Sequence, residues 1–327
     1  MQIFIARFNY EALKGAMSRQ ADVVVVRIRD YSSMRDALAE AIRVLGGLYL
    51  NQDKVAIKIN LCDARTPDTG AITHPASLDA LLWLLRERMS FDGPIYVVEG
   101  DSGTVLADEY ARWFGFSPII ERWGARWLNI AKARKKLLRL NGRIFKAMKL
   151  PDELIGSFFI TLARLKTNII TKITGALKNQ FGCLPFVYKS KFHPWIDEVI
   201  ADINQALRPS LAIVDGLVAH VGVKGPSFGI PSKAGLIVVG KDPVAVDATC
   251  ARILGFSPSS IGHIRACARR GLGKMRNFRL VLLGFSDEED RLPRVRNPWN
   301  PVEHIILRWI DRLRASRLLR AGRRRGG

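Results

Sequence analysis

Residues 236–254, LIVVGKDPVAVDATCARIL, decide the fold class of this 327-residue chain. The run Leu236–Val239 is short, apolar and rich in β-branched residues, which is typical of a buried strand. Asp242 followed by Pro243 is a strong helix-start signal, because aspartate caps free backbone N–H groups and proline fits the first helical position. The apolar residues that follow predict a helix over 243–254. A buried strand followed at once by a helix is the repeating unit of α/β proteins.

The same alternation extends outward along the chain. Apolar runs predict strands at Ile3–Ile5, Val23–Ile28, Val55–Ile59, Ile95–Val98, Phe158–Leu162, Leu211–Val214, Leu236–Val239 and Leu280–Leu283. Helix-like stretches occupy residues 33–46, 76–89, 103–114, 195–206, 243–254 and 260–270. We therefore predict an α/β fold with a mostly parallel sheet flanked by helices. Ligands of such sheets bind beyond the carboxyl ends of the strands, so residues that follow strands are the candidate site residues.

Two segments differ from this pattern, and both are basic. Residues 1–290 are expected to form one α/β domain with an insertion at about 121–150, either a surface helix or a hairpin turning at Asn141-Gly142. Residues 291–327 are expected to form a basic, amphipathic C-terminal helix that is an appendage to the domain. Its apolar residues recur at helical spacing, at Val302, Ile305, Ile306, Trp309, Ile310 and Leu313.

The composition, 48% hydrophobic and 25% charged, excludes a disordered chain. No apolar run approaches the roughly 18 residues that cross a bilayer, and the N-terminus does not resemble a secretion signal, so we predict a cytoplasmic location. The four cysteines form no CxxC pair, which argues against a sequence-local iron–sulfur or zinc motif and leaves the cofactor and any metal undefined. Cys250 fits the core, whereas Cys62 and Cys183 fall in loops where a reactive role stays open.

The net charge of +21 is concentrated in three zones. Residues 121–149 carry ten Lys and Arg against Glu121, residues 154–196 carry six and no acid, and residues 291–327 carry eleven arginines against two acids. Such zones attract nucleic acid, anionic membranes or ligands with phosphate and carboxylate groups. The simpler alternative is that solvated arginine faces reflect a basic proteome.

Polar residues follow several predicted strands. Lys58 and Asn60 share one strand face and suit a carboxylate or phosphate. His74 is either a helix cap or an acid–base residue. Glu99 follows the strand at 95–98, and Asp215 follows the strand at 211–214, where it could orient a lysine or histidine.

The segment 164–185, RLKTNIITKITGALKNQFGCLP, has lysines and glycines but no acid. Lys166 and Lys178, with Lys172 between them, would supply positive charge beside backbone N–H groups at Gly175 and Gly182. This combination favours an anion, although the phosphate-loop pattern GxxxxGK[ST] is absent.

Four further residues complete the candidates. His193 is a second acid–base candidate, and Gly225 and Gly229 bound the GPSFG turn. Asp247 lies one turn into an apolar helix, where an unpaired carboxylate would be costly unless it meets a cation.

Taken in order, VAIKIN, VVEG, ARLKTNIITKITGALKNQFG, His193, LAIVDG, GPSFG and GKDPVAVDATCARILGF resemble the domain of unknown function 362 family. The similarity runs from about Lys54 to Gly273. It implies an α/β protein of a largely uncharacterised family that often carries ferredoxin-type cluster cysteines, which are missing here. Many members have a histidine where this chain has Asn168, so that histidine's role does not transfer. Lys178 and Asn179 match the family pattern.

These observations favour an enzyme or ligand-binding protein that acts on a carboxylate- or phosphate-bearing substrate by lysine-assisted acid–base chemistry. Its catalytic candidates are Lys58, His74, Glu99, Lys178, His193 and Asp215. Its ligand-binding candidates are Asn60, Lys166, Asn168, Gly175, Asn179, Gly182, Gly225, Gly229 and Asp247. Two alternatives stay open: a nucleic-acid-binding protein or nucleic-acid enzyme, and a protein attached to an anionic membrane through the C-terminal helix. Oligomerisation is also open.

Overall fold

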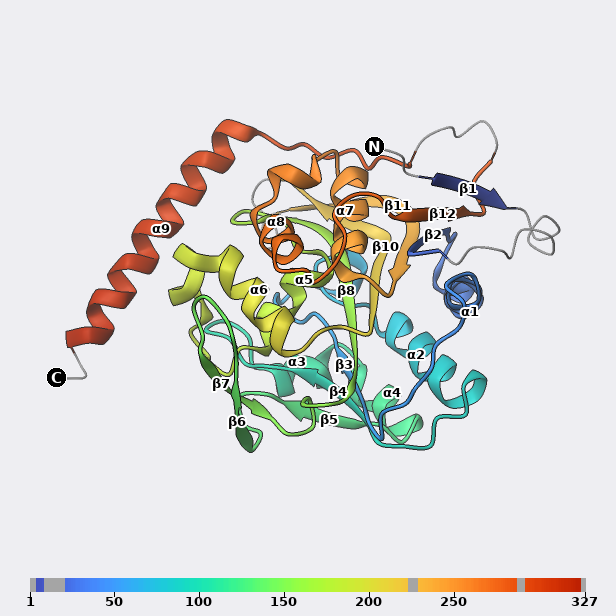
Figure 1. Ribbon diagram of the computed structural model, residues 1–327, viewed down its shortest axis with the longest axis horizontal. Helices are drawn as coiled ribbons and strands as arrows, with labels where there is room; N and C mark the ends of the chain where they lie inside the picture. Colours follow the sequence, from blue (N-terminus) through green and yellow to red (C-terminus); the bar gives the residue numbers. More distant parts are fainter. Residues whose placement is uncertain (1–3, 9–20, 223–228, 287–291, 325–327) are drawn as a thin grey trace.

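The computed structural model describes residues 4–8, 21–222, 229–286 and 292–324, the first range without side chains and the last without side chains beyond Leu313. It has the expected α/β architecture, a large mixed and mostly parallel sheet flanked by helices (Figure 1).

The sheet follows the order β1-β12-β2-β11-β10-β8-β3-β4-β5. These strands are β1 (Phe4–Phe8), β2 (Val23–Arg27), β3 (Val55–Lys58), β4 (Ile95–Glu99), β5 (Arg126–Asn129), β8 (Phe158–Asn168), β10 (Leu211–Val221), β11 (Ile230–Gly240) and β12 (Arg279–Leu283). All pairs along this path are parallel except those of β11, which is antiparallel to β2 and β10. Since few residues separate β10 from β11, there is no room for the crossover that a parallel pair needs.

Helices cover both faces of the sheet, as Figure 1 shows. Side chains alternate along each strand, so Val24 and Val26 of β2 pack in one core while Val23 and Val25 pack in the other. The first core lies under α1 (Met34–Val44), α2 (Pro75–Trp83) and α4 (Phe116–Arg122). The second lies under α5 (Gly175–Asn179), α6 (Ile196–Ala206), α7 (Pro243–Ile253) and α8 (Gly262–Arg269). The remaining helical segments in the described residues are η2 (Tyr31–Ser33), η3 (Pro67–Thr69), η4 (Leu84–Arg88), α3 (Ala107–Trp113), η5 (Gln180–Cys183), η6 (Lys189–Trp195), η7 (Pro258–Ser260) and α9 (Pro301–Arg324).

The basic segment at 121–150 contains a β-hairpin. Strands β6 (Lys135–Arg139) and β7 (Ala147–Pro151) pair antiparallel, and the chain reverses around Asn141 and Gly142. Of the two structures expected for this segment, the hairpin is therefore the one that forms. A short strand, β9 (Lys172–Ile173), pairs with the end of β8.

Helix α9 projects along one side of the molecule at the C-terminal end and contacts η6 (Figure 1). The face of α9 that carries His304 and Asp311 turns toward the body, because His304 is buried and Asp311 contacts His193. No helix in the described residues is long and apolar enough to cross a membrane.

The strand order reverses next to β3. Strands β4 and β5 extend the sheet on one side of β3, whereas β8 and β10 extend it on the other. The loops after β3 and β8 therefore diverge and leave a crevice at the carboxyl edge, which is where open α/β sheets bind ligands.

Candidate functional site: a lysine-lined pocket at the strand-order reversal

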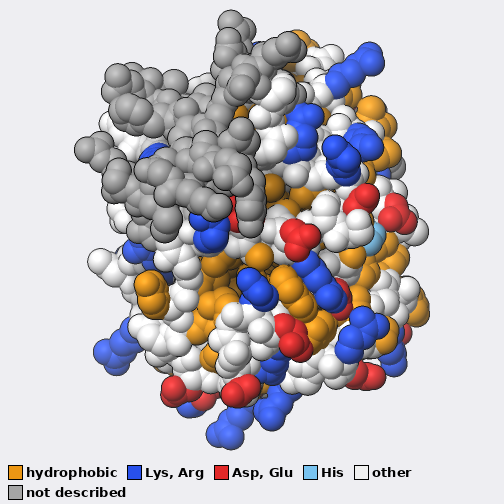
Figure 2. Space-filling model, turned by 90° about the vertical axis from the view of Figure 1, so that its right-hand side faces the viewer, with side chains coloured by type: hydrophobic (Ala, Val, Ile, Leu, Met, Phe, Trp, Pro, Cys, Tyr) orange, Lys and Arg blue, Asp and Glu red, His pale blue; other side chains and the backbone are white. Residues whose placement is uncertain are grey.

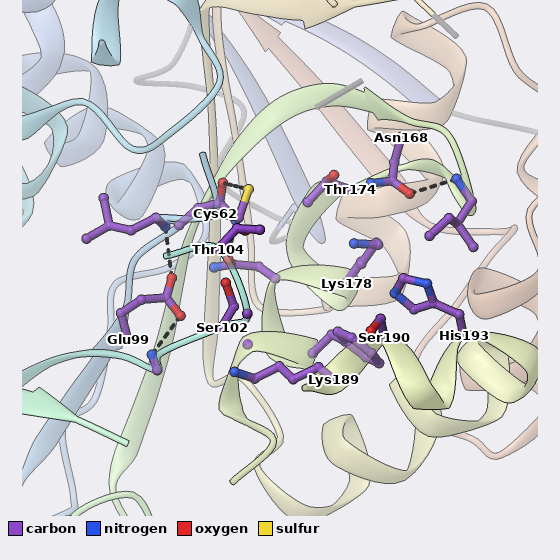
Figure 3. A pocket seen from close by; sticks show the side chains of 18 of the residues that line it. Cys62, Glu99, Ser102, Thr104, Asn168, Thr174, Lys178, Lys189, Ser190 and His193 are labelled. Carbon is purple, nitrogen blue, oxygen red and sulfur yellow. Dashed lines mark hydrogen bonds between the residues drawn. The ribbon is translucent and has the colours of Figure 1, made fainter. Parts of the chain in front are cut away.

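A pocket of about 340 Å³ lies at this carboxyl edge. The loops after β3, β4 and β8, with α5, η5 and η6, form its wall. Eight of the predicted site residues line it: Lys58, Asn60, Glu99, Asn168, Lys178, Asn179, Gly182 and His193. In Figure 3, Asn168, Thr174, Lys178 and His193 lie on one side of the pocket, and Glu99, Ser102 and Cys62 lie on the other.

Lys58 and Glu99 form a buried ion pair, with Nζ 2.8 Å from Oε2. Lys58 Nζ also donates to the Ile59 carbonyl at 2.5 Å, while Glu99 accepts from the backbone N–H groups of Leu61 and Gly100. A Cβ on Gly182 would lie 2.8 Å from both Glu99 Oε1 and Lys58 Nζ, so glycine leaves the room this pair needs. Each member of the pair thus has further hydrogen bonds to the backbone, which fix the pair in place.

A chain of buried amides lies behind the ion pair. Lys166 Nζ donates to Asn60 Oδ1 at 2.7 Å and to the Ala71 carbonyl at 2.5 Å. Asn60 Nδ2 donates to Asn179 Oδ1 at 3.0 Å, and Asn179 Nδ2 donates to the Lys58 carbonyl at 3.1 Å. Lys166 is itself behind the wall and does not line the pocket, so its contribution there is its positive charge.

Lys178 differs from the other lysines of the site. It is half-buried, and its ammonium makes no hydrogen bond or ion pair with any residue that the structure describes; its one recorded contact is with the Phe181 ring, 5.7 Å away. Burial, together with the positive charges of Lys166 and Lys58, lowers the pKa of Lys178 to about 8, against the opposing effects of Cys62 and Asp311.

Thr174 lies one helical turn before Lys178 and also lines the pocket. It is 3% exposed, and its hydroxyl has no hydrogen-bond partner in the described part of the chain. The pocket therefore contains two polar groups without partners among the described residues, and for the buried Thr174 hydroxyl this is rare unless a ligand or water completes it.

Gly175 and Asp247, predicted to bind ligand, do not line the pocket: Gly175 begins α5, and Asp247 lies behind it on α7. Asp247 accepts from the backbone N–H groups of Ala176 at 2.6 Å and Leu177 at 3.0 Å. Its partners are thus backbone donors at the start of α5, with the buried His263 Nε2 3.8 Å from Oδ2 as the one nearby group that could carry positive charge among the described residues, and burial raises its pKa. Gly175 has φ +57°, and a Cβ there would lie 2.2 Å from Asp247 Oδ1. Both residues hold α5, and hence Lys178, in place.

Two groups on η6 complete the pocket. His193 lines it and contacts Asp311 of α9 through Nδ1, at 3.0 Å. Lys189, which the sequence reading missed, is buried and donates to the Asp101 carbonyl at 2.6 Å; burial lowers its pKa. The acid-free composition of 154–196 was the available signal for Lys189.

His74 and Asp215 lie outside the pocket, contrary to their predicted place in one site with Lys178. Asp215 lies inside β10 and pairs with the buried guanidinium of Arg164, where a lysine or histidine partner was expected. It also accepts from Ser77 Oγ at 2.6 Å. His74 caps α2 by accepting a hydrogen bond from the backbone N–H of Ala76, and a helix cap was one of the two roles predicted for it. Its ring stacks on Tyr31, and burial lowers its pKa.

The remaining candidates that the structure describes also lie away from the pocket. The Gly229 carbonyl accepts from Arg65, and Gly229 packs against His220. Gly225 is outside the described residues. Lys172 donates to the Ser260 carbonyl. Cys183 is buried, which raises its pKa to about 12 and argues against a reactive thiol.

Cys62 is the exposed one of the four free cysteines and lines the pocket, with its sulfur 3.1 Å from Lys166 Nζ. Within the described residues, no group of three or more His, Cys, Asp or Glu side chains is arranged to hold a metal ion. The charges that reach the pocket are therefore those of its lysines and of Glu99.

The model of the family described as "Domain of unknown function (DUF362)" matches residues 55–252, more than half of the chain. A thylakoid-associated protein of Synechocystis is 28% identical over 244 residues, which cover 72% of this chain and 73% of that protein. No solved structure matches the chain.

Proposed function

The chain belongs to the domain of unknown function 362 family, and from its pocket we propose that it is an enzyme or ligand-binding protein for a small anion that carries a carboxylate or phosphate group. The observation that carries this proposal is the ammonium of Lys178, which has no hydrogen-bond or ion-pair partner among the described residues, inside a pocket whose other lysines and Glu99 have partners.

The charge of the pocket supports an anion. Lys58, Lys178 and Lys189 line it together with a single carboxylate, Glu99, and Lys166 lies directly behind the wall. Because Lys58 neutralises Glu99, the positive charges of Lys178 and Lys189 are left over. In a partly buried site this excess attracts an anion more strongly than it would in water.

Lys178 and His193 are the groups suited to move a proton. An amine with a pKa of about 8 changes its protonation state near neutral pH, as a general base or acid requires. The contact of His193 Nδ1 with Asp311 fixes the ring and leaves Nε2 as the nitrogen available to a ligand. Glu99, held by Lys58 and two backbone N–H groups, accepts hydrogen bonds from donors fixed within the protein and supports the site.

Calorimetry with phosphate, citrate and lactate, and with uncharged glycerol as a comparison, tests the proposal. At least one anion should bind while glycerol does not, and Lys178→Met should abolish the binding. Lys241→Met is the matched control, because burial also lowers the pKa of Lys241 but it lies outside the pocket and donates to the Leu45 carbonyl. Equal binding by wild type and Lys178→Met would overturn the proposal.

A second candidate function, peripheral attachment to an anionic membrane, is supported by α9. The stripe of Val302, Ile305, Ile306, Trp309 and Leu313 is exposed, between 43% and 68% for each residue. It lies opposite the face that packs on the body, and arginines flank it. Apolar residues on one side of a basic helix insert at the boundary between head groups and acyl chains. The Synechocystis relative is described as thylakoid-associated, which is compatible with this function.

Flotation with anionic and with neutral vesicles tests this candidate. The protein should bind anionic vesicles, and Ile306→Glu with Trp309→Glu should release it without a change in melting temperature. Retention on DNA that survives the double substitution would favour the nucleic-acid alternative instead. Among the described residues on the face in Figure 2, the right-hand side of Figure 1, Lys and Arg are interspersed with Asp and Glu. The cytoplasmic location stays a prediction.

A further inference from the structure

We propose that Lys178 forms an imine with the carbonyl group of a small anion whose carboxylate or phosphate group lies among the neighbouring lysines. This inference rests on the proposed anion-binding function and names the class of substrate: an oxo acid or a phosphorylated aldehyde.

The partners of the four lysines separate Lys178 from the rest. Lys58 has Glu99 and a carbonyl, Lys166 has Asn60 and a carbonyl, and Lys189 has the Asp101 carbonyl. Each of these acceptors stabilises the ammonium form. Lys178 has no hydrogen-bond acceptor among the described residues, and burial, the largest influence on it, disfavours its charged form. A desolvated lysine beside other cations is the usual setting of an imine-forming amine.

The wall around Lys178 suits a carbonyl. Thr174 presents an unpartnered hydroxyl from the preceding helical turn, and that hydroxyl can donate to an oxygen attached to the carbon under attack. The backbone of α5 is held by Asp247, which fixes both side chains at the wall. The positive charge of Lys189 lies in the same pocket, with that of Lys166 directly behind the wall, and these charges can bind the anionic end of the substrate.

The chemical step is balanced without any further reagent. The neutral Nζ of Lys178 attacks the carbonyl carbon, the C–N bond forms, and the electron pair of the carbonyl π bond moves to oxygen. The oxygen takes one proton that the nitrogen releases, which gives a carbinolamine. A second proton transfer lets the C–O bond break, the oxygen leaves as water, and a C=N bond remains. His193 Nε2 and the Thr174 hydroxyl are the groups in the wall that can relay these protons.

Reductive trapping tests the imine. The protein is incubated with pyruvate, or with glycolaldehyde phosphate, and then with sodium borohydride, whose hydride converts the C=N bond into a stable secondary amine. Peptide mass spectrometry locates the adduct. We expect it on Lys178, lost in Lys178→Arg, which keeps the charge, and retained in Lys241→Arg. The two compounds show whether the carboxylate or the phosphate is preferred.

Lactate and glycerol phosphate, which have the anionic group but no carbonyl, separate this inference from the proposed function. If they bind the pocket but neither carbonyl compound leaves an adduct on Lys178, the imine is wrong and anion binding stands. If none of the four compounds binds, both proposals fail. An adduct spread equally over Lys178 and Lys241 reflects non-specific amine chemistry and also overturns the imine.

Discussion

Four lysines of the same site have different chemistry because their surroundings differ. Lys58, Lys166 and Lys189 are almost fully buried, yet each has oxygen acceptors that stabilise its charge. Lys178 is somewhat more accessible to solvent, but it has no oxygen acceptor among the described residues. The number of acceptors, more than burial, therefore separates a structural lysine from a reactive one here.

Replacing Lys178 by methionine should stabilise the protein at neutral pH. At pH 7 the amine of Lys178 is mostly protonated in both the folded and the unfolded protein, and its poorly solvated charge destabilises the folded protein. Since its pKa is about 8 when folded and 10.5 when unperturbed, the unfolded state binds more protons between these values, and wild-type stability rises with pH there. Urea denaturation should show Lys178→Met more stable by on the order of 1–3 kcal/mol at pH 7. The difference should shrink toward pH 10; a gap that does not change with pH would contradict this account.

Asp215→Ala should have the opposite effect on stability. It leaves the guanidinium of Arg164 buried without its carboxylate, and breaking such a pair costs about 3–5 kcal/mol. The double variant Arg164→Met, Asp215→Leu should lose less free energy of unfolding than Arg164→Met and Asp215→Leu lose in total as single variants, because no unpaired charge remains. Guanidinium denaturation of the three variants checks this; additive losses would argue against a coupled pair.

At the scale of elements, helix α5 decides where Lys178 points. It has five residues, too few to be stable alone, so its position depends on contacts with its neighbours. Asp247 of α7 accepts from its first backbone N–H groups, and Gly175 makes the sharp entry. A side chain outside the pocket thus controls the orientation of the group that faces the ligand.

Gly175→Ala should therefore disturb both stability and ligand binding. The left-handed φ of +57° costs a non-glycine residue about 1–2 kcal/mol, and the new Cβ would collide with Asp247. Gly47→Ala is the matched control, since φ is +77° there and nothing lies within 4 Å of the new Cβ. Thermal denaturation should show a larger loss for Gly175→Ala than for Gly47→Ala. Equal losses would mean that the Asp247 contact does not constrain α5.

At the scale of the whole molecule, the body and α9 have different relations to solvent. The sheet and its helices enclose two apolar cores, whereas α9 exposes its apolar stripe and contacts the body through His304, Arg308 and Asp311. The contacts of Arg308 with Asp197 and of Asp311 with His193 are peripheral, and such partly exposed ion pairs contribute about 0–1 kcal/mol each.

Deleting residues 305–327 should consequently leave the fold intact. The truncated protein keeps Trp299 and the buried His304, so its melting temperature should stay within about 4 °C of the full chain. It should no longer bind anionic vesicles if α9 attaches the protein to membranes. Aggregation or a non-cooperative melt would show that α9 is part of the core, contrary to the expectation of a dispensable appendage.

The alternation of strands and helices can be predicted from the sequence, because apolar residues recur along each buried element with the spacing of a strand or a helix. The strand LIVV, followed by GKDP and a helix, can be recognised from these residues alone. The sequence also marked the acid-free segment around Lys178. The tertiary structure decided which of the lysines have acceptors, since those acceptors come from distant positions: Glu99 lies 41 residues from Lys58, and Asn60 lies 106 residues from Lys166. It likewise assigned Asp215 to Arg164 and separated His74 from the pocket. A side-chain partner on a distant strand leaves no periodic pattern in the sequence. Which charged residues pair, and that Lys178 has no partner among the described residues, therefore becomes clear only from the assembled sheet.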